Sequence, residues 1–325
     1  MVNFYKEIVN QGLITRNDLD NAPFNEITQR ISTLDGKGFK RSITTYSHNL
    51  TIKGSKEAKD PEYLLDEGEL KPLTPDDQIA LLLELKASGN RAMQLIFYIA
   101  LFTGARIQTC CTLKIKHLYE KLDSNQNMRL RIGVGTDVDN KNGKNMTLVI
   151  PGWLVNDLKI YVESPRAKAL QQRSTKGESK ENYVFLTNRG QPYYTSKSDA
   201  ATYLHKVKSE ATAQPDALKI YEGTTVRVFL SGLLKRITAT NPEFHQYSFH
   251  DLRASFGMNL LERLLSDPKH TINSALTVLQ QRMGHSDLET TMRYLNYRAH
   301  FNLYTETQDS YEQELLQYVE HQRPS

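Results

Sequence analysis

Cysteine is scarce in this chain: its 325 residues include only Cys110 and Cys111, which are adjacent. Neighbouring cysteines in a helical context form neither a disulfide framework nor a C-x-x-C metal-binding pair. We therefore expect two small buried thiols in a reducing compartment. No stretch approaches 18 consecutive apolar residues, and the N-terminus lacks a basic-then-apolar signal pattern. These absences favour a cytoplasmic protein with no membrane partner.

A strong charge of either sign is also missing, since the formal net charge is +4. A mildly basic chain permits a polyanionic partner without demanding one. Hydrophobic residues make up 39% and charged residues 24%, as in an ordinary globular protein that buries a core. The length suggests roughly two domains, and the sequence has no internal repeats.

The chain divides into four segments by composition. Residues 1–35 predict two short helices, one over residues 2–14 with Gly12 near its end and one around Asn25–Leu34. Residues 36–70 are polar, with several glycines and clustered charge, and are interpreted as a linker with a little local structure. Residues 71–300 form the main domain, and residues 301–325 an acidic tail.

Within the main domain the pattern is mainly helical with one β-hairpin. Thr74-Pro75 is typical of a helix start, and Met93–Phe102 is strongly apolar. Two alternating arms, residues 128–134 and 146–150, flank the turn pair Asn142-Gly143, and Pro151 ends the second arm. Further helices are predicted at Leu154–Glu163, Thr202–Ala211, Thr224–Arg236, Leu252–Leu265, Ile272–Met283 and Leu288–Tyr297. The fold class is therefore α+β.

A basic stretch, residues 164–182, interrupts this pattern and is interpreted as a loop. Two roles stay open for it: a solvated surface, or a contact with a DNA backbone. Its cations are Arg166, Lys168, Arg173, Lys176 and Lys180.

Several polar residues stand at helix ends, where a side chain can be aimed. Gly284 suits the left-handed position after a helix, and Ser286-x-x-Glu289 predicts a capping box for the next helix. His285 would thus lie in a tight turn, with Tyr294 one to two turns further on. A tyrosine on a short helix is by itself usually a core or surface residue.

Two further helix ends carry arginines. Ser248-x-x-Asp251 predicts a capped helix start with His250 in its first turn and Arg253 on the same face, a plausible phosphate clamp. Arg106 follows Thr103-Gly104-Ala105 at the end of an apolar helix. Burying an unpaired arginine is costly, so we expect it to have an anionic partner, either a structural carboxylate or a ligand phosphate.

A lysine near the predicted hairpin turn is the last of the candidate site residues. Lys141 stands beside the Asn142-Gly143 turn, where it could reach into a groove, and Lys144 is only three residues away. Hairpin-tip lysines are commonly just solvated, and the choice between these two stays open.

The ordered set, from Arg106 through Lys141, H-x-x-R and G-H to Tyr294, resembles the catalytic domain of the tyrosine recombinases, the phage integrase family. The resemblance covers about Leu70 to Tyr297, and the nine-residue interval between His285 and Tyr294 matches the family pattern. It implies the tyrosine-recombinase catalytic fold. It also implies DNA cleavage and rejoining through a 3′-phosphotyrosine link, without metal, ATP or any cofactor.

The resemblance assigns a role to each residue. Arg106 and Arg253 resemble the arginine pair on the scissile phosphate, and Lys141 resembles the acid for the leaving 5′ oxygen. His250 matches a proton-transfer and phosphate-orienting histidine, and His285 one that bonds a phosphate oxygen. Tyr294 matches the nucleophile, with Tyr297 as the fallback.

Two departures from the family pattern stand out. An acidic residue commonly lies three positions after the first arginine, where this chain has Thr109; its loss could leave Arg106 less firmly positioned. Residues 1–35 resemble only the end of the helical core-binding domain that usually precedes the catalytic domain, so the chain is interpreted as truncated or a fragment.

The resemblance also implies partners. They are double-stranded DNA, further copies of the chain in a tetramer on two DNA sites, and an accessory DNA-bending protein; DNA binding would associate the protein with the nucleoid. The segment 295–325 has two arginines against five carboxylates, a net charge of −3, and is expected to pack on a neighbouring protomer, or alternatively on its own domain.

Other functions fit parts of the pattern. A topoisomerase-like enzyme would use the same chemistry without strand exchange, and a catalytically silent DNA-binding protein would keep only the fold. A metal nuclease using His245, His250 and His270 is disfavoured, because these histidines lack ligand spacing with nearby carboxylates.

Overall fold

The computed structural model describes residues 7, 11–13, 26–34, 40–48, 63–140, 145–202 and 220–300. These residues belong to two compact units, residues 1–59 and residues 60–325. The predicted acidic tail, the hairpin tip with Lys141, Lys144 and Asn142-Gly143, and most of the predicted helices at 2–14 and Thr202–Ala211 lie outside the described residues.

The first unit contains an antiparallel hairpin rather than a second helix. Strand β1 (Glu26–Leu34) pairs with β2 (Lys40–His48), in a register that runs from Glu26 opposite His48 to Leu34 opposite Lys40. The helix predicted around Asn25–Leu34 is therefore wrong. Its isoleucines have helical spacing, but both strands are rich in threonine and isoleucine, whose branched side chains favour extended backbone.

The second unit begins with a small hairpin in the segment interpreted as a linker. Strands β3 (Leu64–Leu65) and β4 (Glu69–Leu70) pair across a turn of residues 66–68. Leu64 and Leu70 are almost completely buried. This hairpin is thus part of the packed domain.

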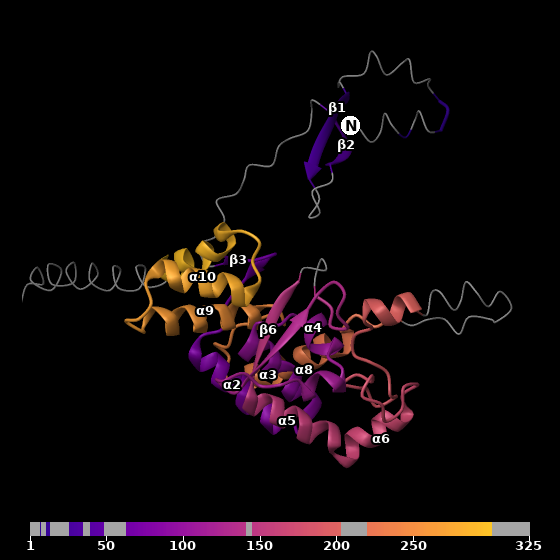
Figure 1. Ribbon diagram of the computed structural model, residues 1–325. Helices are drawn as coiled ribbons and strands as arrows, with labels where there is room; N and C mark the ends of the chain where they lie inside the picture. The colour runs from indigo at the N-terminus through magenta and orange to yellow at the C-terminus, as the bar shows by residue number, and fades with distance from the viewer. Residues whose placement is uncertain are drawn as a thin grey trace, which may run out of the picture. The chain divides into compact units, whose positions relative to one another are not determined.

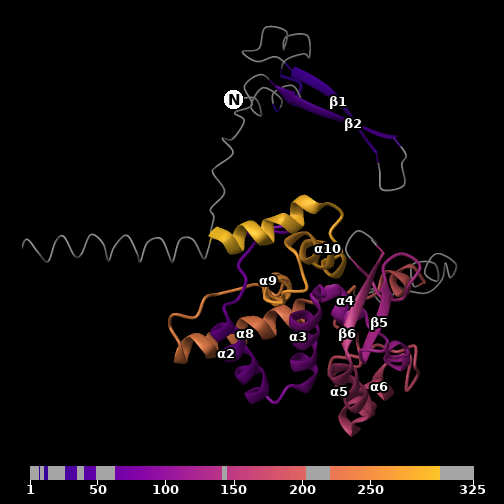
Figure 2. The same ribbon diagram turned by 60° about the vertical axis from the view of Figure 1, so that its left-hand side comes forward.

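Helix α3 (Arg91–Thr103) lies at the centre of the second unit (Figures 1 and 2). Nine of its 13 residues are buried, as its apolar composition predicted. It packs against α2 (Pro75–Ala87), α4 (Ile107–Thr112), α5 (Gly152–Glu163) and α9 (Asp251–Leu265). The predicted cap of α2 is confirmed, because the Thr74 side chain accepts a hydrogen bond from the Asp77 amide.

The β-hairpin arms are confirmed as well. Strand β5 (Asn127–Ile132) pairs antiparallel with β6 (Met146–Pro151), and β6 also contacts α3. Their inward residues Met128, Leu130, Leu148 and Ile150 are buried. The remaining elements are the 3₁₀ helix η2 (Ile115–Tyr119), α6 (Pro165–Arg173), α8 (Thr224–Thr240), α10 (Ile272–Met283) and a helix of residues 288–300.

The loop predicted for residues 164–182 is wrong in its first half, which forms α6. Ser164 caps this helix by accepting from the Ala167 amide, and proline occupies its first position, a favourable start that the basic composition obscured. Lys168 pairs with Glu163 at 2.9 Å and Lys176 with Asp199 at 2.6 Å. Two of the five cations of this stretch therefore already pair with carboxylates of the protein.

Two apolar cores share the second unit. The large core, 41 buried residues including most of α3, spreads over α2, α5, α8 and the β5–β6 hairpin. The small core gathers side chains from β3, β4, α9, α10 and the helix of residues 288–300, among them Leu64, Leu70, Phe256, Met283 and Tyr294. Figures 1 and 2 show α9 and α10 as one group beside α3. Cys110 and Cys111 are buried free thiols, as expected.

Candidate active site

Arg253 is held by the C-terminal ends of two helices. Its Nη1 donates to the Gly104 carbonyl at 2.8 Å and its Nη2 to the Met283 carbonyl at 2.5 Å. Gly104 and Gly284 are the left-handed caps of α3 and α10, with φ of 71° and 65°; the second was predicted. The negative ends of two helix dipoles thus meet one guanidinium, whose side chain is 2% exposed.

Arg106 is held by side chains instead. As the residue before α4, it donates from Nη1 to Asn140 Oδ1 at 2.9 Å and from Nη2 to Glu67 Oε1 at 2.6 Å. The anionic partner expected for this arginine is therefore a carboxylate of the protein. Its side chain is 13% exposed.

A single carboxylate oxygen joins three of the predicted site residues. Asp66 Oδ2 accepts from the Tyr294 hydroxyl at 2.9 Å and lies 3.2 Å from His285 Nε2 and 3.5 Å from Arg253 Nε. Asp66 and Tyr294 are both almost fully buried. The side chains that were predicted to surround a phosphate therefore surround a carboxylate.

The two histidines are held differently. His285 Nδ1 is 3.0 Å from the hydroxyl of buried Thr291, which orients the ring so that Nε2 meets Asp66. His250 is half-buried and immediately precedes α9. Burial and the charge of Arg253 lower the pKa of His250, which favours a neutral imidazole.

The start of α9 differs in detail from the predicted cap. Asp251 is the first helical residue, and its Oδ2 accepts from both the amide and the hydroxyl of Ser248 at 2.6 and 2.8 Å. The serine thus donates to the aspartate instead of capping a helix amide. Asp251 Oδ1 also accepts from the Lys71 amide at 2.7 Å, which ties β4 to this helix start.

The start of the helix at residues 288–300 also has a different cap. Asp287 Oδ1 accepts from the Thr290 amide at 2.8 Å and from the Thr290 hydroxyl at 2.9 Å. The capping box predicted for Ser286 and Glu289 is therefore wrong, because the aspartate one position on takes the capping role. The position of His285 in the preceding turn is unaffected.

Opposite pKa shifts accompany the contact between Asp66 and Tyr294. Burial acts to raise the pKa of Asp66, but the hydrogen bond from His285 and the charges of Arg253 and His285 outweigh it and lower that pKa. Burial, followed by the Asp66 charge, raises the pKa of the Tyr294 hydroxyl. This arrangement therefore keeps Asp66 ionised and Tyr294 protonated.

Five of the six predicted site residues come together here: Arg106, His250, Arg253, His285 and Tyr294. The sixth, Lys141, and its alternative Lys144 lie outside the described residues. Thr109, where the family pattern has an acid, donates its hydroxyl to the Asp139 carbonyl at 2.9 Å. Glu67 is the carboxylate that contacts Arg106 instead.

Sequence reasoning missed Asp66, Glu67, Asn140 and Thr291. The first two lie in D-E-G between leucines, a turn pattern flanked by apolar residues that could have indicated a buried hairpin. Asn140 precedes the hairpin turn without any distinguishing pattern. Thr291 could have been found from its helical spacing to Tyr294, but only after the turn that holds His285 was known.

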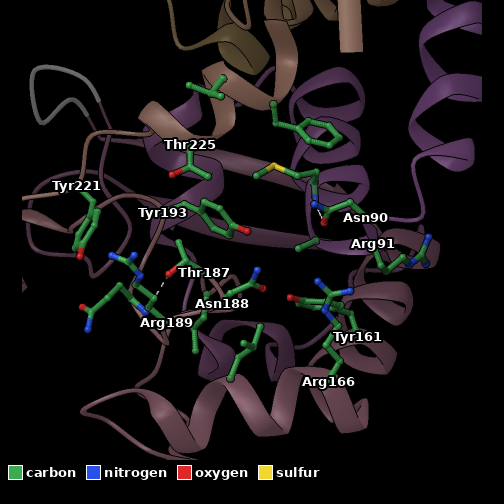
Figure 3. A pocket seen from close by; sticks show the side chains of 17 residues that line it. Asn90, Arg91, Tyr161, Arg166, Thr187, Asn188, Arg189, Tyr193, Tyr221 and Thr225 are labelled. Carbon is green, nitrogen blue, oxygen red and sulfur yellow. Dashed lines mark hydrogen bonds between the residues drawn. The ribbon is translucent and has the colours of Figure 1, made fainter. Parts of the chain in front are cut away.

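A cavity of about 560 Å³ lies beside the N-terminal end of α3, among residues of α5, α6, α8 and the 186–193 segment. In Figure 3, Tyr193 projects into it between Arg189 on one side and Arg91 and Arg166 on the other. Asn90 caps α3 here by accepting from the Met93 amide at 3.3 Å. None of the residues that line this cavity belongs to the cluster around Asp66.

Among the described residues, no helix is long and apolar enough to cross a membrane. In the same part of the chain, no three histidine, cysteine, aspartate or glutamate side chains gather closely enough to hold a metal ion.

Three solved structures are similar to part of this chain. One is the Tn1549 transposon integrase (residues 82–397) in complex with circular intermediate DNA, with 17% identity and a TM-score of 0.43 over 69% of this chain and 61% of that one. A second is the Y379F variant of the same integrase in complex with transposon right end DNA. It has 17% identity and a TM-score of 0.42, over 69% of this chain and 60% of that one. The catalytic domain of bacteriophage HP1 integrase has 19% identity and a TM-score of 0.33, over 73% of this chain and 95% of that one.

This chain thus spans about three fifths of the first two relatives. No curated protein matches it. A profile of the phage integrase family matches residues 71–300, more than two thirds of the chain and all of the helices that hold Arg106, Arg253, His285 and Tyr294. The chain belongs to the phage integrase family.

Proposed function

We propose that this protein is a site-specific DNA recombinase that cleaves and rejoins DNA through a covalent 3′-phosphotyrosine intermediate. The observation that carries the proposal is the meeting of Arg253, His285 and Tyr294 at one anionic oxygen, Asp66 Oδ2. A cation, an imidazole and a hydroxyl around one oxygen are what attack on a phosphodiester requires.

Unpaired donors support a phosphate as the ligand of this site. Among the described residues, Arg106 Nε and Arg253 Nε are buried side-chain atoms without a hydrogen-bond partner. A buried donor normally has a partner. The non-bridging oxygens of a phosphate bound between the two guanidiniums would supply the missing acceptors.

In the proposed reaction, the Tyr294 oxygen attacks phosphorus, and the bond from phosphorus to the 5′ oxygen breaks. The neutral His250 imidazole accepts the phenolic proton. Arg106 and Arg253 balance the negative charge that accumulates on the non-bridging oxygens, and His285 donates to one of them. The products are a 3′-phosphotyrosine and a free 5′ hydroxyl.

Lys141 is proposed to give its proton to the leaving 5′ oxygen, following the family resemblance. Because the phosphotyrosine link retains the energy of the phosphodiester, the 5′ hydroxyl of a partner strand can reverse the step without ATP. Rejoining to a different strand yields recombination. This requires two DNA sites, and we propose a tetramer of the chain across them, assisted by a DNA-bending protein.

The test is covalent capture on nicked duplexes drawn from the DNA that flanks the gene. Wild-type protein should form a protein–DNA adduct, and Tyr294→Phe should form none while keeping its DNA affinity. Tyr297→Phe is the matched control, because it removes the other tyrosine hydroxyl of the same helix and should retain the adduct. An adduct that survives in Tyr294→Phe and disappears in Tyr297→Phe would reassign the nucleophile.

Burial of Tyr294 favours one alternative, a DNA-binding protein without catalysis, because its hydroxyl is inaccessible and bonded to Asp66. That protein would bind duplex DNA and form no adduct on any substrate. A topoisomerase-like enzyme would form the adduct but relax single DNA molecules without exchanging strands between two sites.

A further inference from the structure

One short turn supplies the carboxylates that contact both arginines. Asp66 lies 3.5 Å from Arg253 Nε, and its neighbour Glu67 accepts from Arg106 at 2.6 Å. The same Asp66 oxygen also accepts from Tyr294. Two consecutive acidic residues therefore occupy the positions that a phosphodiester would take between the arginines and the nucleophile.

A phosphate and this turn cannot occupy the site together. Two like charges about 4 Å apart repel by about 4 kcal/mol at the effective dielectric of a protein surface, and by more in a buried site. Tyr294 is also fully buried while its hydroxyl donates to Asp66. DNA binding in the reactive geometry therefore requires this turn to withdraw.

The hairpin is built so that its tip can withdraw while its base stays. Leu64 and Leu70 on either side are buried in the small core. The Arg293 side chain donates to the Leu65 carbonyl at 3.2 Å, and the Lys71 amide donates to Asp251 at 2.7 Å. Residues 66–69 lie between these anchors, and residues 66–68 of them form the turn.

The tip itself is strained. Glu67 has φ of 58°, a left-handed conformation that side chains other than glycine adopt rarely and at a cost of about 1–3 kcal/mol. The ion pair with Arg106 offsets that cost in the DNA-free protein. Once the arginine binds another anion, the turn loses this compensation.

We propose that the turn Asp66–Glu67 is an autoinhibitory contact: in the DNA-free protein it fills the phosphate site and keeps Tyr294 buried, and a DNA phosphate must displace it. The inference rests on the proposed function in taking the two arginines as a phosphate site. The occupant it competes with is a phosphate anion, which permits a test without any DNA.

The first experiment measures the thermal unfolding midpoint against inorganic phosphate concentration, with ionic strength held constant by sodium chloride. Asp66→Asn/Glu67→Gln should unfold at a lower temperature than wild type without phosphate, because two arginines lose their counter-charges. Phosphate should then raise its midpoint by about 4 °C or more, and that of wild type by much less.

Two control variants identify the site of this effect. Glu69→Gln removes an exposed carboxylate of the same hairpin and should behave like wild type. Adding Arg253→Ala to the double variant should abolish the response to phosphate. An equal phosphate response in wild type and in the double variant would overturn the inference.

Hydrogen exchange on wild-type protein covers the case in which the double variant fails to fold. Duplex DNA containing the cleavage site should accelerate exchange of the amides of residues 66–68 while leaving those of Leu64 and Leu70 protected. Unchanged or stronger protection of residues 66–68 would mean that the turn stays in place, contrary to the inference.

Covalent capture separates this inference from the proposed function. If the turn inhibits, Asp66→Asn/Glu67→Gln should form the Tyr294 adduct at least about tenfold faster than wild type. Slower adduct formation would mean that Asp66 assists Tyr294, and the inference fails. If no variant forms an adduct but the phosphate response appears as described, the proposed function fails while the competition between turn and phosphate stands.

Discussion

The two apolar cores of the second unit carry different halves of the candidate site. The large core positions Arg106 and Asn140 through α3, α4 and β5–β6, and it contains none of the groups that change partners in the proposed reaction. The small core contains Tyr294 and is flanked by the acidic turn. The Arg253 side chain links the two cores, because it donates hydrogen bonds to the carbonyls of Gly104, at the end of α3, and Met283, at the end of α10. The larger core fixes one side of the site, whereas the side that must rearrange rests on fewer contacts.

Arg253→Ala should have the largest effect on stability, because it breaks the link between the two cores. It leaves two carbonyls and the buried Asp66 carboxylate without their cation, a loss of about 3–5 kcal/mol. Urea unfolding measures this loss of unfolding free energy. Arg263→Ala, on the exposed face of the same helix, is the control, and its unfolding free energy should stay within about 0.5 kcal/mol of the wild-type value. A loss below about 1 kcal/mol would show that the cores hold together without Arg253.

Gly257→Ala should destabilise the small core alone. A Cβ atom at this position on α9 would lie 2.3 Å from Tyr294 Cε1, so the tyrosine ring must shift, at a cost of about 1–3 kcal/mol. Gly232→Ala on α8 is the control, because its Cβ would meet only Arg236 Nη1 at 3.8 Å, and alanine favours a helix by about 0.5–1 kcal/mol. Equal unfolding midpoints for the two variants would contradict the packing of Tyr294 against α9.

Acid should weaken the small core through Asp66. Because its pKa is lower in the folded protein than in the unfolded chain, Asp66 contributes stability above its unfolded pKa of about 4, which is lost as pH falls toward the folded value. Wild-type unfolding free energy should therefore fall below pH 4 more steeply than that of Asp66→Asn, by up to about 1.4 kcal/mol per pH unit. Parallel curves from urea titrations would argue against an ionised, buried Asp66.

Arg106→Ala should have the smallest effect on stability and a large one on catalysis. Its partners are side chains, and Glu67 is 31% exposed, so the loss should be about 1 kcal/mol. The rate of covalent adduct formation should nevertheless fall at least about 100-fold, the scale of removing one donor to a developing oxyanion. A stability loss equal to that of Arg253→Ala would erase the difference between the two sides of the site.

Local patterns predicted the large core well. The apolar run of α3, the cap at Thr74 and the alternating arms of β5–β6 are decided by neighbours in sequence, so the pattern alone was sufficient. The strand at Glu26–Leu34 and the helix at Pro165–Arg173 were missed. In the first, β-branched side chains on a pairing strand outweighed helical spacing; in the second, a good cap outweighed a polar composition.

The site itself was predictable only in part. Arg253, His285 and Tyr294 could be named because glycine caps and helix starts fix their positions locally. Their shared partner could not: Asp66 is 219 residues away from His285 and 228 from Tyr294 along the chain. Contacts of that separation are set by tertiary packing, which a turn pattern in one sequence does not reveal.

The two carbonyls that bind Arg253 determine when the site can form during synthesis and folding. Neither carbonyl that holds this guanidinium is in place until α3 and α10, 149 and 30 residues away from it, have both reached their final positions. A chain still emerging from the ribosome, or one with a misfolded C-terminal half, has no assembled pair of arginines. The proposed DNA cleavage would thereby be withheld until both helices have folded.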